Sequence, residues 1–188
     1  MVHMYAIIAL GNPGNQYLKT RHNAGWIVID SIFTDIDWHE NKYASAHVAT
    51  AEIGNTTFQI AKPQTFMNES GKTTDYFVQK EGINPDKLIV LYDDLDLPLG
   101  SFKTSFDRGN GGHNGVKSIE EHLGSREFIR IRIGISRTLE NGELVKPAVL
   151  GHFEPSELEL LQKTAKTIYK AIGTILTEGK EKAMTAFN

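Results

Sequence analysis

The feature that most constrains the fold is a short apolar run near the start of the chain that leads directly into a tight turn. Residues 5–10 carry no charge and are rich in isoleucine. Such a run is too short for a typical helix and is typical of a buried β-strand. The Gly-Asn-Pro-Gly turn that follows places Asn12 between a glycine, which has wide backbone freedom, and a proline, which fixes one backbone angle. We therefore expect Asn12 at the carboxyl end of a strand, where open α/β sheets bind their ligands.

A basic tripeptide, Arg-His-Asn, follows this turn. His22 lies directly before apolar residues that recur at helical spacing between positions 29 and 36. We expect Asn12 and His22 to face one cleft. A histidine before a helix is more often a surface or capping residue than a catalyst, so these two residues alone leave both interpretations open.

The composition excludes several classes of protein. With 188 residues, 40% of them hydrophobic, the chain fits one globular domain spanning residues 1–188. It has no cysteine, which excludes disulfides, a cysteine nucleophile and cysteine-ligated zinc. No segment approaches the roughly 20 apolar residues of a membrane span, and no leader is evident; we expect a soluble cytoplasmic protein. The net charge of −3 requires any nucleic acid to bind a local basic patch.

The middle of the chain predicts a hairpin, a helix and a second buried strand. Residues 44–53 and 56–62 flank a Gly-Asn pair suited to a two-residue turn. A helix is expected before Gly82, and Met67 with Asn68 fits either a staple and cap at its start or a site. The apolar run 88–92 fits a strand buried on both faces.

Three aspartates, Asp93, Asp94 and Asp96, are expected just past this second strand. That is again the edge where α/β sheets keep their chemistry. Clustered carboxylates suit Mg²⁺, but their spacing matches no calcium loop, and we expect no metal site.

A glycine-dense loop at residues 107–115 leads into a helix predicted over residues 116–123. It lacks the Gly-Lys-Ser/Thr ending of a nucleotide-binding loop and the spacing of a dinucleotide fingerprint. His113 and Asn114 either line the cleft or cap the helix.

The strict alternation of residues 128–135 predicts a strand with isoleucines on one face and Arg130 and Arg132 on the other. The arginine face is either a phosphate-binding surface or a plain solvated face. Residues 140–146 are expected to form a mobile loop. Residues 156–159 match a capping box before an amphipathic helix, and a last helical turn or two is expected over residues 180–187.

Five ordered motifs resemble those of bacterial peptidyl-tRNA hydrolase: GNPGNQY, TRHNAG, KPQTFMNESG, YDDLDLPLG and GNGGHNGVKSI. The likeness covers residues 7–134 and weakens after Ser136. It implies a single-domain α/β protein with a twisted mixed β-sheet sandwiched between α-helices. It also implies a monomeric enzyme without a cofactor that cleaves the ester between a peptide and the terminal ribose of tRNA. Its partner is then peptidyl-tRNA, and its role is to free tRNA from stalled translation.

The resemblance also implies residue roles. His22 matches the catalytic histidine and Asp93 the carboxylate that hydrogen-bonds it. A neutral imidazole can take a proton from water, while a carboxylate on its other nitrogen fixes the tautomer. The residues implied to bind the substrate match the active-site crevice: Asn12, Asn68 and Asn114, with Tyr17, Met67 and His113 beside them. Asparagine amides can donate to a developing oxyanion, a role we give to Asn114 or Asn12.

The expected phosphate contacts are Lys103, Lys117 and Arg132. Departures from the family pattern at Ser105, Asp107, Arg108 and residues 136–138 bear on RNA docking and not on the His22–Asp93 pair.

Two other functions compete with this one. An RNA-binding protein could keep the scaffold without hydrolysis, although such a module has no physical need for this site. A metal-dependent amidohydrolase could use His22, His113 and Asp93 as ligands, and activity that survives chelation would remove that alternative.

Overall fold

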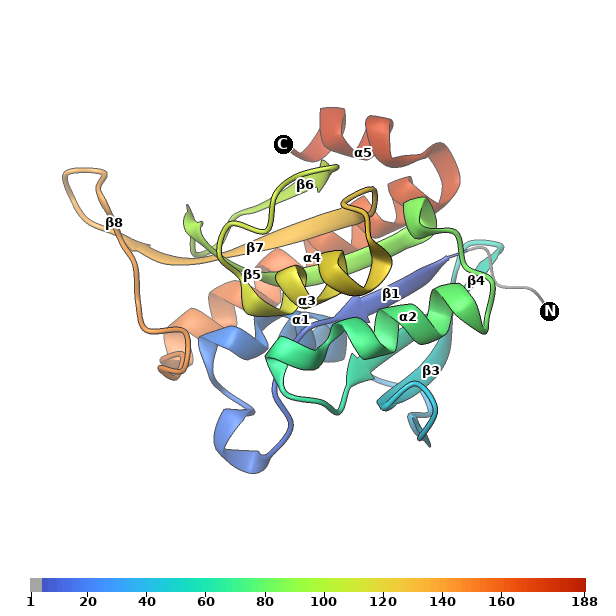
Figure 1. Ribbon diagram of the computed structural model, residues 1–188. Helices are drawn as coiled ribbons and strands as arrows, with labels where there is room; N and C mark the ends of the chain where they lie inside the picture. Colours follow the sequence, from blue (N-terminus) through green and yellow to red (C-terminus); the bar gives the residue numbers. More distant parts are fainter. Residues whose placement is uncertain (1–4) are drawn as a thin grey trace.

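The computed structural model describes residues 5–188, and these form a mixed eight-stranded sheet covered by helices (Figure 1). The strands run in the order β2-β3-β4-β1-β5-β7-β6, with β8 paired to β7. Four central strands are mutually parallel: β4 (Thr56–Pro63), β1 (Ala6–Ala9), β5 (Leu88–Pro98) and β7 (Ile129–Thr138). The antiparallel strands are β2 (His39–Asn41), β3 (Ala46–Ile53), β6 (Phe102–Phe106) and β8 (Leu144–Val145). The expected mixed α/β sheet is confirmed.

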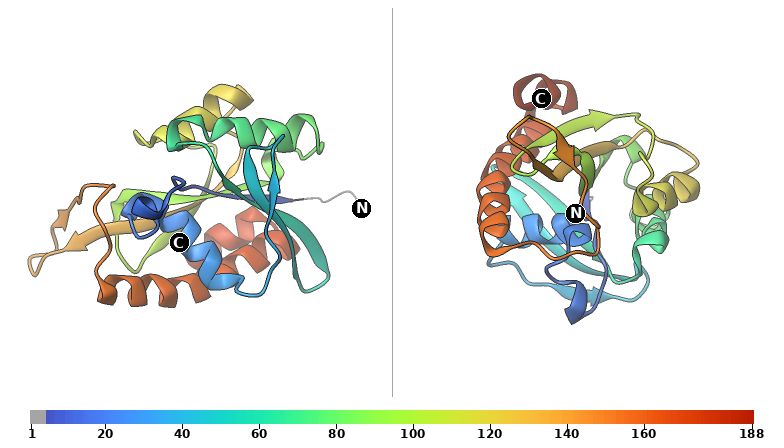
Figure 2. Two further views of the ribbon diagram at one scale, coloured as in Figure 1. Left: turned by 90° about the horizontal axis from the view of Figure 1, so that it is seen from below. Right: turned by 90° about the vertical axis from the view of Figure 1, so that its left-hand side faces the viewer.

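Helices cover both faces of this sheet (Figure 2). On one face lie α1 (Ala24–Ile32) and α4 (Pro155–Glu178), and on the other lie α2 (Gly71–Gln79) and α3 (Asn114–Leu123). Alternate residues of β1 therefore enter different cores: Ile7 packs with α1 and α4, while Ile8 packs with α2 and α3. A double-sided core explains why the central strands have continuous apolar runs. The last helix, α5 (Lys180–Phe187), lies against β6, where the rings of Phe187 and Phe102 are 6.3 Å apart.

Several local predictions are confirmed. β3 and β4 form the expected hairpin across Gly54 and Asn55, with Ile53 opposite Thr56. Gly54 has a φ of 61°, the left-handed conformation that a tight turn requires. Helix α1 ends earlier than the apolar spacing indicated, because Phe33 leaves helical geometry and Ile36 lies beyond the helix. Ile36 still packs against the core.

The basic face expected on β7 is not a solvated face. Arg130 is 0% exposed and Arg132 is 6% exposed. The Arg130 guanidinium lies 4.1 Å from the centre of the Phe128 ring and 3.2 Å from the Glu120 carboxylate of α3. Arg132 is 2.7 Å from Asp94. The prediction of exposure was wrong because the alternating pattern identifies a second face of the strand but not the acidic side chains of α3 and β5 that cover it.

The acidic residues also differ from their expected place, since β5 continues to Pro98. Asp93 and Asp94 lie within the strand, opposite Ile133 and Gly134 of β7, and the pairing becomes irregular only after Asp94. The carboxylates therefore extend from the sheet itself, near its carboxyl edge. A strand holds them more rigidly than a loop would.

Two predictions for the carboxyl-terminal part of the chain are wrong. The capping box of α4 is formed by Glu154 and Glu157 around Pro155 at the first helical position, and not by residues 156–159. Residues 140–146 are not all loop, because β8 pairs with the end of β7 and forms a two-stranded arm that extends from the body (Figure 1). Among residues 5–188, no helix combines the length and apolar character needed to cross a membrane.

Candidate active site

A pocket of about 200 Å³ lies at the carboxyl edge of the parallel strands. It is bounded by the end of β5, the glycine-rich loop before α3, and the segment that follows β8. The residues that matter for its chemistry are His22, Asp93, Asp94, His113, Asn114 and Lys146. Segments from four separate parts of the sequence thus meet at the edge where ligands bind in α/β folds.

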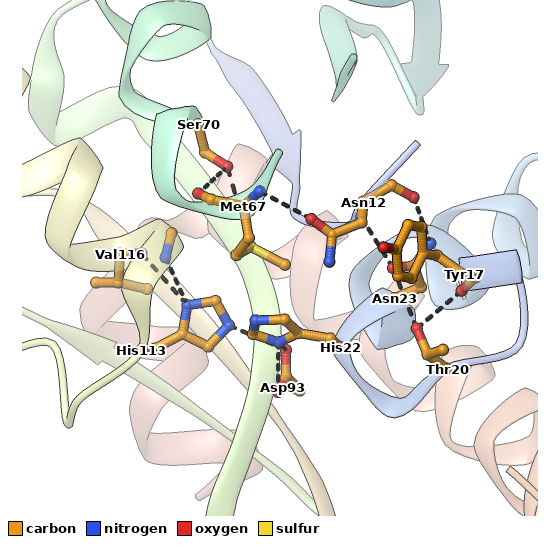
Figure 3. Close-up of polar contacts among 11 residues, drawn as sticks. Asn12, Tyr17, Thr20, His22, Asn23, Met67, Ser70, Asp93, His113 and Val116 are labelled. Carbon is orange, nitrogen blue, oxygen red and sulfur yellow. Dashed lines mark hydrogen bonds and ion pairs between the residues drawn. The ribbon is translucent and has the colours of Figure 1, made fainter. Parts of the chain in front are cut away.

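The structure brings His22 and Asp93 into direct contact, although 71 positions separate them (Figure 3). The His22 Nδ1 atom is 2.9 Å from Asp93 Oδ1 and 3.1 Å from Oδ2. Both side chains are buried, with 8% of His22 and 3% of Asp93 exposed. A carboxylate accepts, so Nδ1 carries the proton and the lone pair of Nε2 is left for chemistry.

The environment keeps Asp93 ionised. Burial alone raises the pKa of its carboxyl group, but electrostatic attraction and hydrogen bonding from the rings of His113 and His22 outweigh burial and hold that pKa well below its ordinary value. An ionised carboxylate fixes the tautomer of His22 and stabilises the positive charge that an imidazole gains when it accepts a proton.

The backbone around His22 is tied to the strap of residues 149–153. The amides of Arg21 and His22 donate to the carbonyl groups of Gly151 and Val149, at 2.9 and 2.8 Å. The Arg21 side chain is buried and its Nη2 donates to Glu157 Oε2 at 2.6 Å. A short 3-10 helix, η2 (Arg21–Asn23), is therefore anchored to the start of α4. The sequence pattern gave no sign of this anchor, because its two charges are 136 positions apart.

Asn12 is fixed by a second amide that sequence reasoning missed. Asn23, which is 0% exposed, accepts from the Asn12 backbone N–H at 2.9 Å and donates to the Asn12 carbonyl at 3.0 Å. The Asn12 side-chain Oδ1 accepts from the Met67 amide at 2.8 Å. Since Oδ1 is engaged, the free group is the Nδ2 donor, and Figure 3 shows it on the side of His22. In the sequence, the only sign that Asn23 belongs to the site is its position next to His22.

His113 caps α3 and also contacts the acidic residue of the site. Its Nδ1 accepts from the amides of Gly115 and Val116, and its Nε2 lies 2.9 Å from Asp93 Oδ1. The two alternatives that the sequence left open, cleft and cap, therefore both hold. Asn114 lines the pocket from the first position of the helix.

Met67, Asn68 and Tyr17, which were also expected in the crevice, are not among the residues that line this pocket. Met67 is buried beside Gly115, where an added Cβ would lie 2.6 Å from its sulfur. Asn68 is exposed in the 3-10 helix η3 (Met67–Glu69), and Tyr17 is half-buried in η1 (Asn15–Tyr17).

The three basic residues expected to contact phosphate have different surroundings. Lys103 on β6 and Lys117 on α3 are exposed, whereas Arg132 is buried against Asp94. Lys103 lies opposite Arg132 in the β6–β7 pairing. The departure at Ser105 lies on the same strand, opposite Arg130.

Within the described residues, His22, Asp93 and His113 have ligand atoms within 4.8 Å of one another, as a metal site would need. The ring orientation of His113 opposes that use. A neutral histidine that binds a metal through Nε2 carries its proton on Nδ1, but here Nδ1 faces the N–H groups of Gly115 and Val116 at 3.2 and 3.3 Å. Metal binding through Nε2 would therefore point the Nδ1–H of His113 at the N–H groups of Gly115 and Val116, with no acceptor between them.

Fold and site together indicate a class: an α/β protein with a buried histidine–carboxylate pair in a pocket at the carboxyl edge of its sheet, an arrangement typical of enzymes that use general acid–base catalysis. Comparison with known proteins narrows the class. The model of the peptidyl-tRNA hydrolase family matches residues 6–188. The chain is 42% identical over 187 residues to the peptidyl-tRNA hydrolase of Carboxydothermus hydrogenoformans, covering 98% of each chain. It is 40% identical over 186 residues to that of Lawsonia intracellularis, covering 97% of this chain and 92% of the relative.

Solved structures agree with the sequence comparison. The crystal structure of peptidyl-tRNA hydrolase from Acinetobacter baumannii superposes with a TM-score of 0.84 at 28% identity, covering 100% of this chain and 96% of the other. The chain belongs to the peptidyl-tRNA hydrolase family and is a hydrolase.

Proposed function

We propose that this protein hydrolyses the ester between the peptide and the terminal ribose of peptidyl-tRNA, with His22 as general base and Asp93 as the residue that orients it. The observation that carries the proposal is the 2.9 Å contact between His22 Nδ1 and a buried, ionised Asp93, which leaves the Nε2 lone pair of this pocket-lining histidine available. The substrate class follows from family membership. The cellular role inferred from that substrate is the recycling of tRNA from stalled or aborted translation.

The proposed reaction needs no covalent intermediate. Nε2 of His22 takes a proton from water as the water oxygen attacks the ester carbonyl carbon, and Asp93 stabilises the resulting imidazolium. Collapse of the tetrahedral intermediate breaks the bond to the ribose oxygen. His22 then returns its proton to that oxygen, which releases the free peptide acid and intact tRNA.

Asn12 is the better of the two candidates for oxyanion stabilisation. Its amide is pre-oriented, because Oδ1 is held by the Met67 N–H and only the Nδ2 donor remains free. The Asn114 side chain is exposed and makes no hydrogen bond to another described residue. A donor that is already fixed costs no reorganisation during the reaction. We assign Asn114 and Asn68 to contacts with the peptide, and Tyr17 and Met67 to the walls of the crevice.

The exposed lysines supply the proposed phosphate contacts. Lys103 and Lys117 are free to approach an RNA backbone, although Lys117 is 3.9 Å from Glu121. Arg132 is buried, and its Nε is already paired with Asp94. We therefore shift the main phosphate contact to Lys103. We propose that the protein works as a monomer and that it acts in the cytoplasm.

One assay tests reaction, selectivity and metal independence together. Purified protein is incubated with N-acylated and with free aminoacyl-tRNA in the presence of EDTA, and release of the acylated amino acid is followed. We expect rapid hydrolysis of the N-acylated substrate alone. Binding without hydrolysis would identify an RNA-binding module, and loss of activity on chelation would identify a metal-dependent hydrolase.

A further inference from the structure

Both ring nitrogens of His113 are occupied by groups of the protein itself. Nδ1 faces the backbone N–H groups of Gly115 and Val116 at 3.2 and 3.3 Å, and Nε2 is 2.9 Å from Asp93 Oδ1. A neutral imidazole has one N–H and one lone-pair nitrogen. Because Nδ1 faces two donors, it is the lone-pair nitrogen, and the proton is on Nε2. His113 therefore donates to Asp93.

The start of α3 is held firmly enough to impose this tautomer. A Cβ at Gly115 would lie 2.6 Å from the Met67 sulfur and 2.9 Å from Leu10 Cδ1, so the helix begins in close contact with both side chains. Its first amides consequently point at His113 with little freedom. They also form the positive end of the helix dipole, where an added proton on Nδ1 is disfavoured.

The carboxylate of Asp93 is shared between two imidazoles. Oδ1 lies 2.9 Å from His22 Nδ1 and 2.9 Å from His113 Nε2, and the two rings are tilted by 52° at a centroid distance of 4.8 Å. Two donors that approach from different directions hold the carboxylate in one orientation. The neighbouring acids are engaged elsewhere, Asp94 by Arg132 and Asp96 by Lys146.

We propose that His113 is a positioning residue of the reaction and not a ligand of the substrate: the amino terminus of α3 fixes its Nε2–H tautomer, and this N–H holds Asp93 in the orientation that aligns His22. The inference rests on the proposed general-base role of His22. It revises the sequence-based expectation that His113 contacts the substrate, because the ring has no polar atom left to offer.

Two variants separate the two hydrogen bonds of the ring. His113→Asn keeps an acceptor suited to the helix cap, since asparagine is a favoured cap residue, but its amide is too short to reach Asp93. His113→Gln extends an amide nitrogen toward Asp93 and gives up the cap. We expect His113→Asn to lower kcat on the order of tenfold to a hundredfold, the effect of one lost hydrogen bond to a charged group, with KM and melting temperature near those of the wild type. We expect His113→Gln to retain most of kcat and to melt at a lower temperature.

Two results would overturn this inference. A rise in KM for both variants at unchanged kcat would show that the ring contacts the substrate. If kcat falls in both variants in proportion to the fall in melting temperature, His113 acts only as a structural cap of α3. His22→Ala in the same assay keeps the two proposals apart: an inactive His22→Ala beside a fully active His113→Asn rejects the role of His113 alone, whereas an active His22→Ala rejects the general base and the inference built on it.

Discussion

Asn23 holds the backbone of Asn12 through both edges of its side-chain amide, accepting from the N–H at 2.9 Å and donating to the carbonyl at 3.0 Å. This pair joins the turn after β1 to the 3-10 helix that carries His22. The proline of the turn restricts the backbone and the glycines leave it free, but the bidentate amide fixes the position of Asn12 relative to His22.

Asn23→Asp should therefore damage the site although the side chain keeps its shape. The carboxylate would face the Asn12 carbonyl without a donor, in a place that is 0% exposed. We expect a loss of about 2–3 kcal/mol in the free energy of unfolding, typical of an unsatisfied buried polar group, together with a fall in kcat. Urea unfolding and steady-state kinetics measure both. Asn141→Asp, on the exposed arm, is the matched control, and equal behaviour of the two variants would refute the clamp.

Asp93→Asn should lower kcat and leave KM nearly unchanged. An amide can present its NH₂ group to His22 and favour the wrong tautomer, so we expect a loss of roughly two orders of magnitude or more. An unchanged kcat would show that Asp93 does not orient the base.

The lowered pKa of Asp93 also predicts that the free energy of unfolding depends on pH, and the Asp93→Asn variant tests this. The pKa of Asp93 is lowered in the folded protein, so its ionised form stabilises the fold above the ordinary carboxyl pKa of about 3.9 and this contribution disappears as pH falls through the folded-state value. The difference in unfolding free energy between wild type and Asp93→Asn should thus be largest near neutral pH and shrink in acid. A difference that grows in acid would contradict the assigned direction.

Glu157→Ala should destabilise the protein through Arg21. The variant leaves a buried guanidinium without its carboxylate, at a cost of about 3 kcal/mol, the lower end for a buried pair because Arg137 on the other side of Glu157 reaches the surface. It also removes half of the α4 capping box. Since Arg21 precedes His22, we expect kcat to fall as well. Glu159→Ala, exposed on the same helix, is the control, and a Glu157 variant as stable as this control would refute the anchor.

Lys103→Ala should weaken binding of tRNA-linked substrates. If Lys103 contacts one phosphate, the slope of log KM against log salt concentration should decrease by about one unit, while a short peptidyl-adenosine substrate is hydrolysed as before. Lys166→Ala, on the exposed face of α4, should change neither property. An equal loss on both substrates would exclude a phosphate contact.

The sequence predicts the parts of this fold that depend on local pattern. The apolar runs of β1 and β5 and the Gly54-Asn55 turn carry their own structural signals, and the resemblance of the motifs placed His22 and Asp93 in one site. The buried arginines of β7 were missed, because alternation identifies two faces but not what covers the second one. Glu120 and Asp94, which neutralise them, lie in other elements.

The sequence does not predict the roles of side chains that depend on the three-dimensional arrangement of their partners. The pairs Ser156–Glu159 and Glu154–Glu157 have the same spacing, so spacing alone could not tell which pair caps α4. Pro155 occupies the first helical position, which makes Glu154 the cap. The contacts of His113 with both the helix and Asp93 depend on the direction of the first amides of α3, and that direction depends on the packing of the helix against Met67 and Leu10.

The most direct test of the proposed mechanism is the turnover of N-acylated aminoacyl-tRNA by His22→Ala, measured beside its circular dichroism and melting curve. We expect no measurable hydrolysis above the uncatalysed rate in a protein whose spectrum and melting temperature remain near those of the wild type. Hydrolysis at a rate close to that of the wild type by this folded variant would contradict the assignment of His22 as the general base.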